Sequence, residues 1–118
     1  MDKRNIIQEK SYKFALKIIE LVQQLPRSTV GFVVGNQLLK AGTSIGANVE
    51  EAIAGFSKED FTYKMSIAQK EAREAHYWLR LTRDSKITAN TDVNSLINDS
   101  EEIRKILTSI VKTSQKHS

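Results

Sequence analysis

The sequence predicts an all-α protein folded as an antiparallel, up-down-up-down four-helix bundle, with residues 1–118 forming one domain. Apolar residues recur at steps of three and four along four segments, which is the spacing of one helical face. The segments are separated by the only proline, Pro26, by Gly55 and by the polar stretch 86–92. Aromatic residues make up only 7% of the chain, while Ala, Leu, Ile, Lys and Glu are abundant, a composition that favours helices.

The first helix is expected to end before Pro26, because a proline lacks the backbone N–H and clashes with the preceding turn. Its apolar residues keep to one helical face, as in a helix that packs against a core. They are Ile7, Phe14, Ile18, Leu21 and Leu25.

The second helix is expected to begin at Ser28 or Thr29, either of which can cap it with a side-chain oxygen. Its core-facing residues alternate at steps of four and three, which suits near-antiparallel neighbours. They are Val34, Leu38, Ala41, Ile45, Asn48 and Ala52. The segment also holds two pairs of glycines four residues apart, which indicate close helix packing or a local kink. They are Gly31, Gly35, Gly42 and Gly46.

Gly55 is expected to end the second helix in a left-handed C-cap conformation. Ser57 is expected to cap the third helix, with Asp60 completing an arrangement that resembles a capping box. This helix is expected to run from about Lys58 to about Ser85.

Three stripes run along the third helix at helical spacing. The first is apolar and contains Phe61, Met65, Ala68, Ala72, Ala75 and Leu79. The second lies beside it and contains Ile67, Glu71, Glu74, Trp78 and Leu81. The third is basic and contains Gln69, Arg73, His76, Arg80 and Arg83. Two adjacent seams indicate that the helix contacts more than one neighbour, within a bundle or within an oligomer of bundles.

The last helix is expected to follow the loop 86–92, with Thr91 or Asp92 as its cap. Its core-facing residues are Leu96, Ser100, Ile103, Leu107 and Ile110, with Val93, Ile106 and Val111 alongside. The polar tail 113–118 is expected to fray.

The net charge of +4 and the pI of about 9.4 are compatible with an acidic partner such as RNA or DNA but do not require one. The chain has no cysteine, which excludes disulfides, thiol nucleophiles and cysteine-bound metals and fits a reducing cytoplasm. No stretch is long and apolar enough to cross a bilayer, and the first residues do not resemble a signal peptide. We therefore expect a cytoplasmic protein without a membrane partner.

A motif spread over the second and third helices resembles that of the bacterial four-helix-bundle proteins called 23S rRNA-intervening sequence proteins. The matching residues are Ser44-Ile45-Gly46-Ala47-Asn48, Glu51, Ser57, Phe61, Lys64, Ile67-Ala68, Lys70-Glu71-Ala72, Glu74 and Tyr77-Trp78-Leu79. Other branches of the fold often have proline where Gly46 stands, and glycine is the form of the intervening-sequence branch.

The resemblance also carries expectations about assembly and partners. The fold is shared with the accessory variability protein of diversity-generating retroelements, a pentameric ring that works with a reverse transcriptase and RNA. The resemblance therefore implies a homo-oligomer, with a pentamer as the expected assembly, and a nucleic-acid partner.

Several polar residues fall in the apolar seams and require partners there. Asn48 is interpreted as a register-setting residue that bonds to a neighbouring helix, with a ligand contact as the alternative. Glu71 and Glu74 are interpreted as structural carboxylates that pair with Lys, Arg or Asn48 across the bundle or a subunit interface. Glu51 and Trp78 are assigned to the same structural or interface group.

Two basic stripes are the candidate nucleic-acid contacts. Lys10, Lys13 and Lys17 share a face of the first helix, and Arg73, Arg80 and Arg83 share a face of the third. Tyr77 is the candidate for stacking on a base. Both stripes on one side of the bundle would form a basic surface. The alternative for each stripe is an ordinary solvated face.

The sequence contains no catalytic arrangement, no cofactor motif and no set of metal ligands. Its two histidines are too few for a di-metal bundle, and one of them lies in the tail. We therefore expect a non-enzymatic protein that binds RNA or another nucleic acid. The alternative is a protein-interaction scaffold without nucleic-acid contact.

Overall fold

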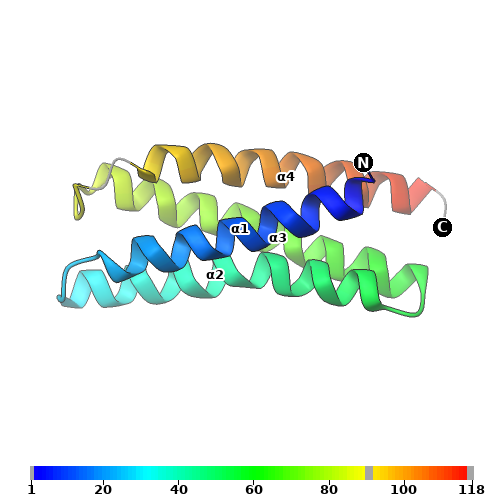
Figure 1. The fold of residues 1–118 in the computed structure, drawn as a ribbon, viewed down its shortest axis with the longest axis horizontal. Coiled ribbons are helices and arrows are strands. Elements are labelled where there is room, and N and C mark those ends of the chain that lie inside the picture. The colour runs from blue at the N-terminus through cyan, green and yellow to red at the C-terminus, as the bar shows by residue number, and fades with distance from the viewer. Residues whose placement is uncertain (1, 90–91, 117–118) are drawn as a thin grey trace.

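The computed structural model describes residues 2–89 and 92–116. They form four helices, which are α1 (Lys3–Gln23), α2 (Thr29–Ala54), α3 (Lys58–Asp84) and α4 (Asp92–Lys116). Successive helices run in opposite directions along a bundle of 46 × 21 × 18 Å (Figure 1). The predicted fold class, an antiparallel up-down-up-down four-helix bundle, is confirmed.

Each helix packs against two neighbours, and the order around the bundle is α1, α2, α3 and α4. Among the described residues, α1 makes no close backbone contact with α3, and α2 makes none with α4, since these pairs lie diagonally across the core. As a result, α4 separates the outer faces of α1 and α3. This arrangement determines which basic residues can share a surface.

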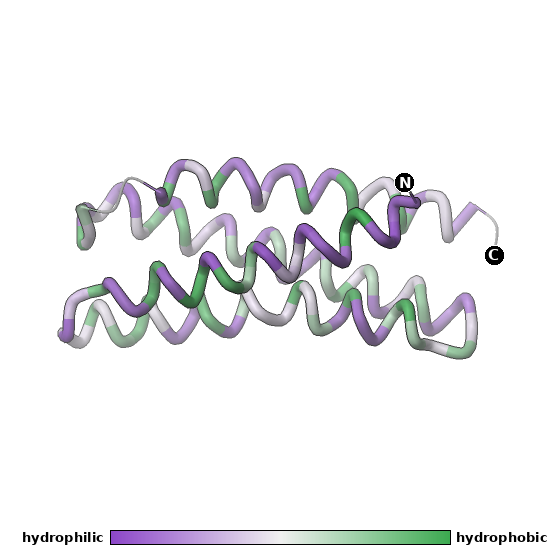
Figure 2. Tube along the Cα trace, viewed as in Figure 1, coloured by the Kyte–Doolittle hydropathy of each residue, from purple (hydrophilic) through white to green (hydrophobic). Residues whose placement is uncertain are grey.

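The core is filled by apolar residues from all four helices, which recur at helical spacing along each of them (Figure 2). The predicted seam of α2 is confirmed in its centre, where Leu38, Ala41 and Ile45 are buried. One position is wrong, since Val49 is buried in the core where the sequence pattern placed Asn48. Asn48 instead lies half-buried on the flank of α2.

The predicted N-caps are confirmed at α2 and α3. The Ser28 hydroxyl accepts a hydrogen bond from Gly31 N at 3.0 Å, and the Ser57 hydroxyl accepts one from Asp60 N at 3.0 Å. The left-handed C-cap at Gly55 is wrong, because this residue is extended with φ −68° and ψ 159°. An added Cβ at Gly55 would lie 2.6 Å from Asp60 Oδ2, at the end of an exposed side chain that can move, and 3.3 Å from the backbone oxygen of Ala52.

The last helix is longer than we expected from the polar sequence of its tail, because α4 continues to Lys116. Val111 and Ser114 are buried, and the Ser114 hydroxyl shares a hydrogen bond with the Thr62 hydroxyl of α3. These contacts order the last turns, so the expectation that the whole tail frays is wrong. Asp92 is the first helical residue, and the alternative cap Thr91 lies outside the described residues.

Candidate nucleic-acid interface

The basic stripe of α1 is engaged in ion pairs within the chain. Lys10 pairs with Glu102 of α4, and Lys17 Nζ lies 3.2 Å from Asp99 Oδ2. Lys13 Nζ lies 2.8 Å from Glu9 Oε1, one turn earlier in the same helix. The hydrogen bond to Glu102 and the negative charge of this carboxylate raise the pKa of Lys10.

All these pairs are exposed to solvent, and such pairs contribute about 0–1 kcal/mol. A phosphate could therefore displace the carboxylates. It would meet their negative charge nearby, so α1 is a weaker anion site than its lysines alone indicate.

The outer face of α3 has a different character. Arg73, Tyr77 and Arg80 are exposed, and no carboxylate of the described residues forms an ion pair with either arginine. The Arg80 guanidinium carbon lies 5.9 Å from the centroid of the Tyr77 ring, within the range of a cation–π contact. This arrangement offers two cations and an aromatic ring on one surface.

Arg83 continues the stripe but is partly engaged. Its Nε donates to Asp84 Oδ1 at 2.8 Å, and its Nη1 donates to Asn94 Oδ1 of α4 at 3.4 Å. Its guanidinium pKa is raised by the hydrogen bond to Asp84 and by the charge of this carboxylate.

His76 lies in the same stripe, and its Nε2 is 3.6 Å from Glu101 Oε1. Burial and then the charge of Arg80 lower its pKa, which outweighs the opposing effect of Glu101. His76 is therefore mainly neutral at pH 7 and adds little to the positive charge of this face.

The two basic stripes lie on opposite flanks of α4. Lys10 and Lys17 face its Glu102 and Asp99 from the α1 side. From the α3 side, Gln69 Nε2 donates to Thr108 Oγ1 at 2.8 Å, and His76 contacts Glu101. The single basic surface that would combine the stripes of α1 and α3 is thus divided by α4.

The interpretation of Asn48 as a link to a neighbouring helix is wrong. Its Nδ2 donates to the carbonyl oxygen of Ser44 in its own helix at 2.8 Å. Because the side chain is only half-buried and bonds locally, it does not set the register between helices.

Glu71 is the least satisfied polar residue of the α2–α3 edge. Its Oε2 is covered by protein atoms and has no hydrogen-bond partner in the described chain. Burial raises the pKa of this carboxyl group, and the charge of Glu74 raises it further, against the opposite effects of Lys70 and Lys40. The predicted partner of Glu71 is thus not found within the described residues of the chain.

The remaining predicted interface residues lie along the same α2–α3 edge. Glu74 is exposed, and Glu51 Oε2 lies 3.5 Å from Lys64 Nζ across the two helices. Trp78 is half-buried, packs against the core and meets the Tyr77 ring edge-on with centroids 5.4 Å apart. This edge therefore combines polar and apolar groups that are incompletely covered.

Sequence interpretation missed a third set of cations on the second half of α4. Lys105, Lys112 and Lys116 are exposed and form no ion pair with the described residues. A signal was available, since no Asp or Glu follows Glu102 in the sequence.

In the described part of the chain, no group of three or more His, Asp or Glu side chains is placed to hold a metal ion. None of the helices described has a segment both long and apolar enough to span a membrane. The geometry thus defines a small all-α bundle whose distinctive chemistry is the distribution of charge on its outer faces.

Comparison with known proteins identifies the family. The sequence model described as 23S rRNA-intervening sequence protein matches residues 3–109, and the chain belongs to this family. The resemblance drawn from the motif is therefore confirmed. No curated protein matches the chain.

One similar solved structure is a protein of unknown function from the S23 ribosomal protein family of Bacteroides thetaiotaomicron. It is 42% identical, with a TM-score of 0.86, over 94% of this chain and 99% of that chain. The likeness extends over nearly the whole bundle.

Proposed function

We propose that this protein is a non-enzymatic, homo-oligomeric bundle of the cytoplasm that binds RNA or another nucleic acid through its basic helix faces. The observation that carries the proposal is the outer face of α3, where Arg73, Tyr77 and Arg80 are exposed and the arginines have no carboxylate partner in the described residues. Arginine makes bidentate contacts to phosphate, and a tyrosine ring can stack on a base.

The other predicted contacts have a secondary role in this proposal. Lys10, Lys13 and Lys17 must exchange their carboxylates for phosphates, and Arg83 must leave Asp84. Binding should therefore be centred on α3 and should extend to α1 only for a ligand that reaches around the bundle.

The α2–α3 edge supports the proposal of a homo-oligomer. Glu71 has a covered oxygen without a hydrogen-bond partner among the described residues, and Val33 and Leu81 remain 52% and 39% exposed. A cationic group of a second subunit would satisfy the carboxylate, and its apolar side chains would cover the rest. The family resemblance makes a pentamer the assembly we propose, to be measured by light scattering.

The test is fluorescence anisotropy of a labelled structured RNA in 50 and 200 mM salt, with the double variant Arg73→Glu/Arg80→Glu. Binding should weaken at least tenfold in the variant and should fall with salt, because neutralised phosphates release counterions. The matched control is Arg27→Glu/Lys86→Glu, at exposed loop positions. Each pair changes the net charge of +4 by four units to zero, so a selective loss in the first variant assigns binding to α3.

The second candidate function is a protein-interaction scaffold with no nucleic-acid contact. It is favoured by an exposed apolar row on α1, formed by Tyr12, Leu16 and Ile19 at steps of four and three. An oligomer that binds no RNA at either salt concentration would reject the first proposal and leave the scaffold.

A further inference from the structure

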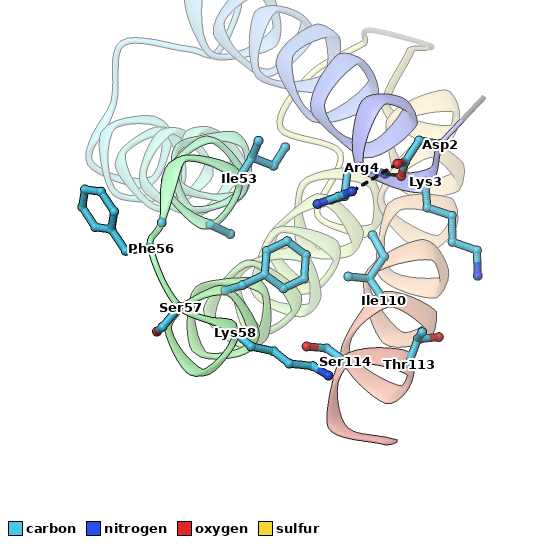
Figure 3. Close-up of a pocket in the computed structure, with 13 residues that line it drawn as sticks. Asp2, Lys3, Arg4, Ile53, Phe56, Ser57, Lys58, Ile110, Thr113 and Ser114 are labelled. Carbon is cyan, nitrogen blue, oxygen red and sulfur yellow. Dashed lines mark hydrogen bonds and ion pairs between the residues drawn. The ribbon is translucent and has the colours of Figure 1, made fainter. Parts of the chain in front are cut away.

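An open pocket of about 680 Å³ lies at the end of the bundle where the start of α1, the α2–α3 turn and the last turns of α4 meet (Figure 3). Ile53, Phe61 and Ile110 form its apolar wall. Lys3 and Arg4 lie on its rim, and Arg4 extends from α1 into the space bordered by Ile53 and Ile110 (Figure 3). Asp2 lines the same pocket, and its Oδ2 lies 3.4 Å from Arg4 Nη2 (Figure 3). The pocket therefore combines an apolar interior with an entrance that carries two cations and one carboxylate.

The rim is continuous with the lysine face of α4. A second, open hollow lies on the surface of this helix alone, and Lys105, Lys112 and Lys116 are among the residues that line it. Thr113 lines both hollows, and Lys3 of the pocket donates a hydrogen bond to Ser109 of the α4 hollow. A ligand that occupies one hollow can thus extend into the other.

The charges of α4 are segregated along its length. In its first half, Asp99 and Glu102 neutralise lysines of α1. Its second half presents three lysines that have no ion pair among the described residues. An ordinary solvated helix face does not require its acidic and basic residues to be separated. An anion-binding surface does benefit from this separation, because no carboxylate competes with the anion for the lysines.

We propose that this end of the bundle binds single-stranded nucleic acid, with phosphates along Lys105, Lys112 and Lys116 and one unstacked base in the pocket against Phe61 and Arg4. The proposal rests on the nucleic-acid function proposed above and names the form of nucleic acid and a second site for it. The contacts proposed at this site do not involve the arginines of α3.

The spacing of the lysines favours a polyanion over a small anion. They are seven and four residues apart, which corresponds to about 10 and 6 Å along a helix that rises 1.5 Å per residue. One phosphate cannot contact all three, but a nucleic-acid backbone can.

The pocket chemistry favours a base over an alkyl chain. The flat face of a base packs on an aromatic ring and under a guanidinium group, as Phe61 and Arg4 allow. The exposed hydroxyl group of Thr113 lines the same pocket and can contact a polar edge of a base, which an alkyl chain would not offer. A duplex keeps its bases stacked and cannot insert one without unpairing it.

The experiment measures anisotropy of the full chain with three labelled probes of twelve nucleotides: a uridine strand, an abasic strand with the same phosphates, and a duplex. The uridine strand should bind about tenfold more tightly than the abasic strand, in the range expected for stacking of one base. Equal affinity for uridine and abasic strands would overturn the assignment of the pocket.

Two variants locate the site. Thr113→Trp fills the mouth of the pocket from an exposed helix position, so it should remove the preference for uridine over abasic strand while the protein stays folded. Lys112→Glu/Lys116→Glu should weaken both strands about tenfold or more, and circular dichroism checks that each variant is helical. A preference that survives Thr113→Trp would contradict base binding in the pocket.

The α3 variant Arg73→Glu/Arg80→Glu separates this inference from the proposed function. If it abolishes binding of all probes and the α4 variant changes nothing, the nucleic-acid function stands and the α4 site is wrong. If neither charge reversal affects binding, both proposals are rejected. Loss of the uridine strand in the α4 variant, with structured RNA still bound, supports two distinct sites.

Discussion

Gly42 lies where α2 crosses α1, and its replacement by alanine should destabilise the bundle. A Cβ at this position would lie 2.8 Å from Ile18 Cγ1 and 2.9 Å from Ile18 Cγ2. Ile18 is fully buried and branched next to its backbone, so it cannot yield without displacing α1. Overpacking of this kind costs about 1–3 kcal/mol, whereas alanine returns up to about 1 kcal/mol of helix propensity.

The expected net loss is therefore about 1 kcal/mol of unfolding free energy. With an unfolding entropy of about 2.1 cal/mol/K per residue, the 118 residues give about 250 cal/mol/K, so Tm should fall by about 4 °C. Urea and thermal unfolding followed by circular dichroism, at one protein concentration, measure the change.

Gly46→Ala is the matched control, one turn further along α2. Its Cβ would meet Ser11 Oγ at 3.4 Å, which is an ordinary contact. This variant should gain up to about 1 kcal/mol from helix propensity. If Gly42→Ala proves as stable as Gly46→Ala, the steric argument at Ile18 is refuted.

Three further predictions concern titration and capping. Glu71→Gln should stabilise the separate, monomeric chain at pH 7, because the raised pKa of Glu71 means that its ionised form disfavours folding there. In pH-dependent urea unfolding at low protein concentration, this gain should vanish below the ordinary pKa of 4.5. In an oligomer that pairs Glu71 with a cation, the same variant should instead weaken association. The lowered pKa of His76 means that its protonation favours the unfolded state, so the protein should lose unfolding free energy as pH falls below 6.5. His76→Gln should reduce this loss, and a variant that loses as much unfolding free energy as the parent would contradict the argument. Ser57→Ala should cost about 1 kcal/mol by removing the hydrogen bond to Asp60 N, whereas an unchanged urea midpoint would exclude a stabilising cap.

Much of the fold could be predicted because its determinants are local. The turn at Pro26 and the caps at Ser28 and Ser57 depend on residues within one helical turn. The errors occurred where tertiary contacts decide. Asn48 and Val49 both fit a helical stripe, and only the packing of α2 against its neighbours determines which is buried. The helical end of α4 similarly depends on the contact between Ser114 and Thr62 of α3.

The candidate site was less predictable, because charge acts through distances that the sequence does not contain. The stripe of Lys10 and Lys17 was visible, but its pairing with Glu102 and Asp99 depends on the register of α1 against α4. The diagonal placement of α1 and α3 is a property of the whole bundle. The lysines of α4 had a sequence signal in the absence of acids after Glu102, but the residues are not spaced as a compact motif.

The division of the cations gives a quantitative prediction for the salt dependence of binding. Two arginines of α3 and three lysines of α4 are exposed and have no ion pair among the described residues: Arg73, Arg80, Lys105, Lys112 and Lys116. If these five neutralise phosphates, log K for a single strand that contacts both sites of one subunit should fall with log salt at a slope of about −3.5, since each contact contributes about −0.7.

Participation of Lys10, Lys13 and Lys17 would add three contacts and bring the slope to about −5.6. Their carboxylates stay nearby after a phosphate binds and limit the gain from exchange, which is why the smaller value is expected. Titration between 50 and 300 mM salt measures the slope, with the subunit number fixed by light scattering. Lys112→Glu/Lys116→Glu should reduce the magnitude of the salt slope by about 1.4, which is two contacts of about 0.7 each. Lys10→Glu/Lys17→Glu should leave the slope unchanged. The opposite result would place the phosphates on α1 and reject the argument from ion pairing.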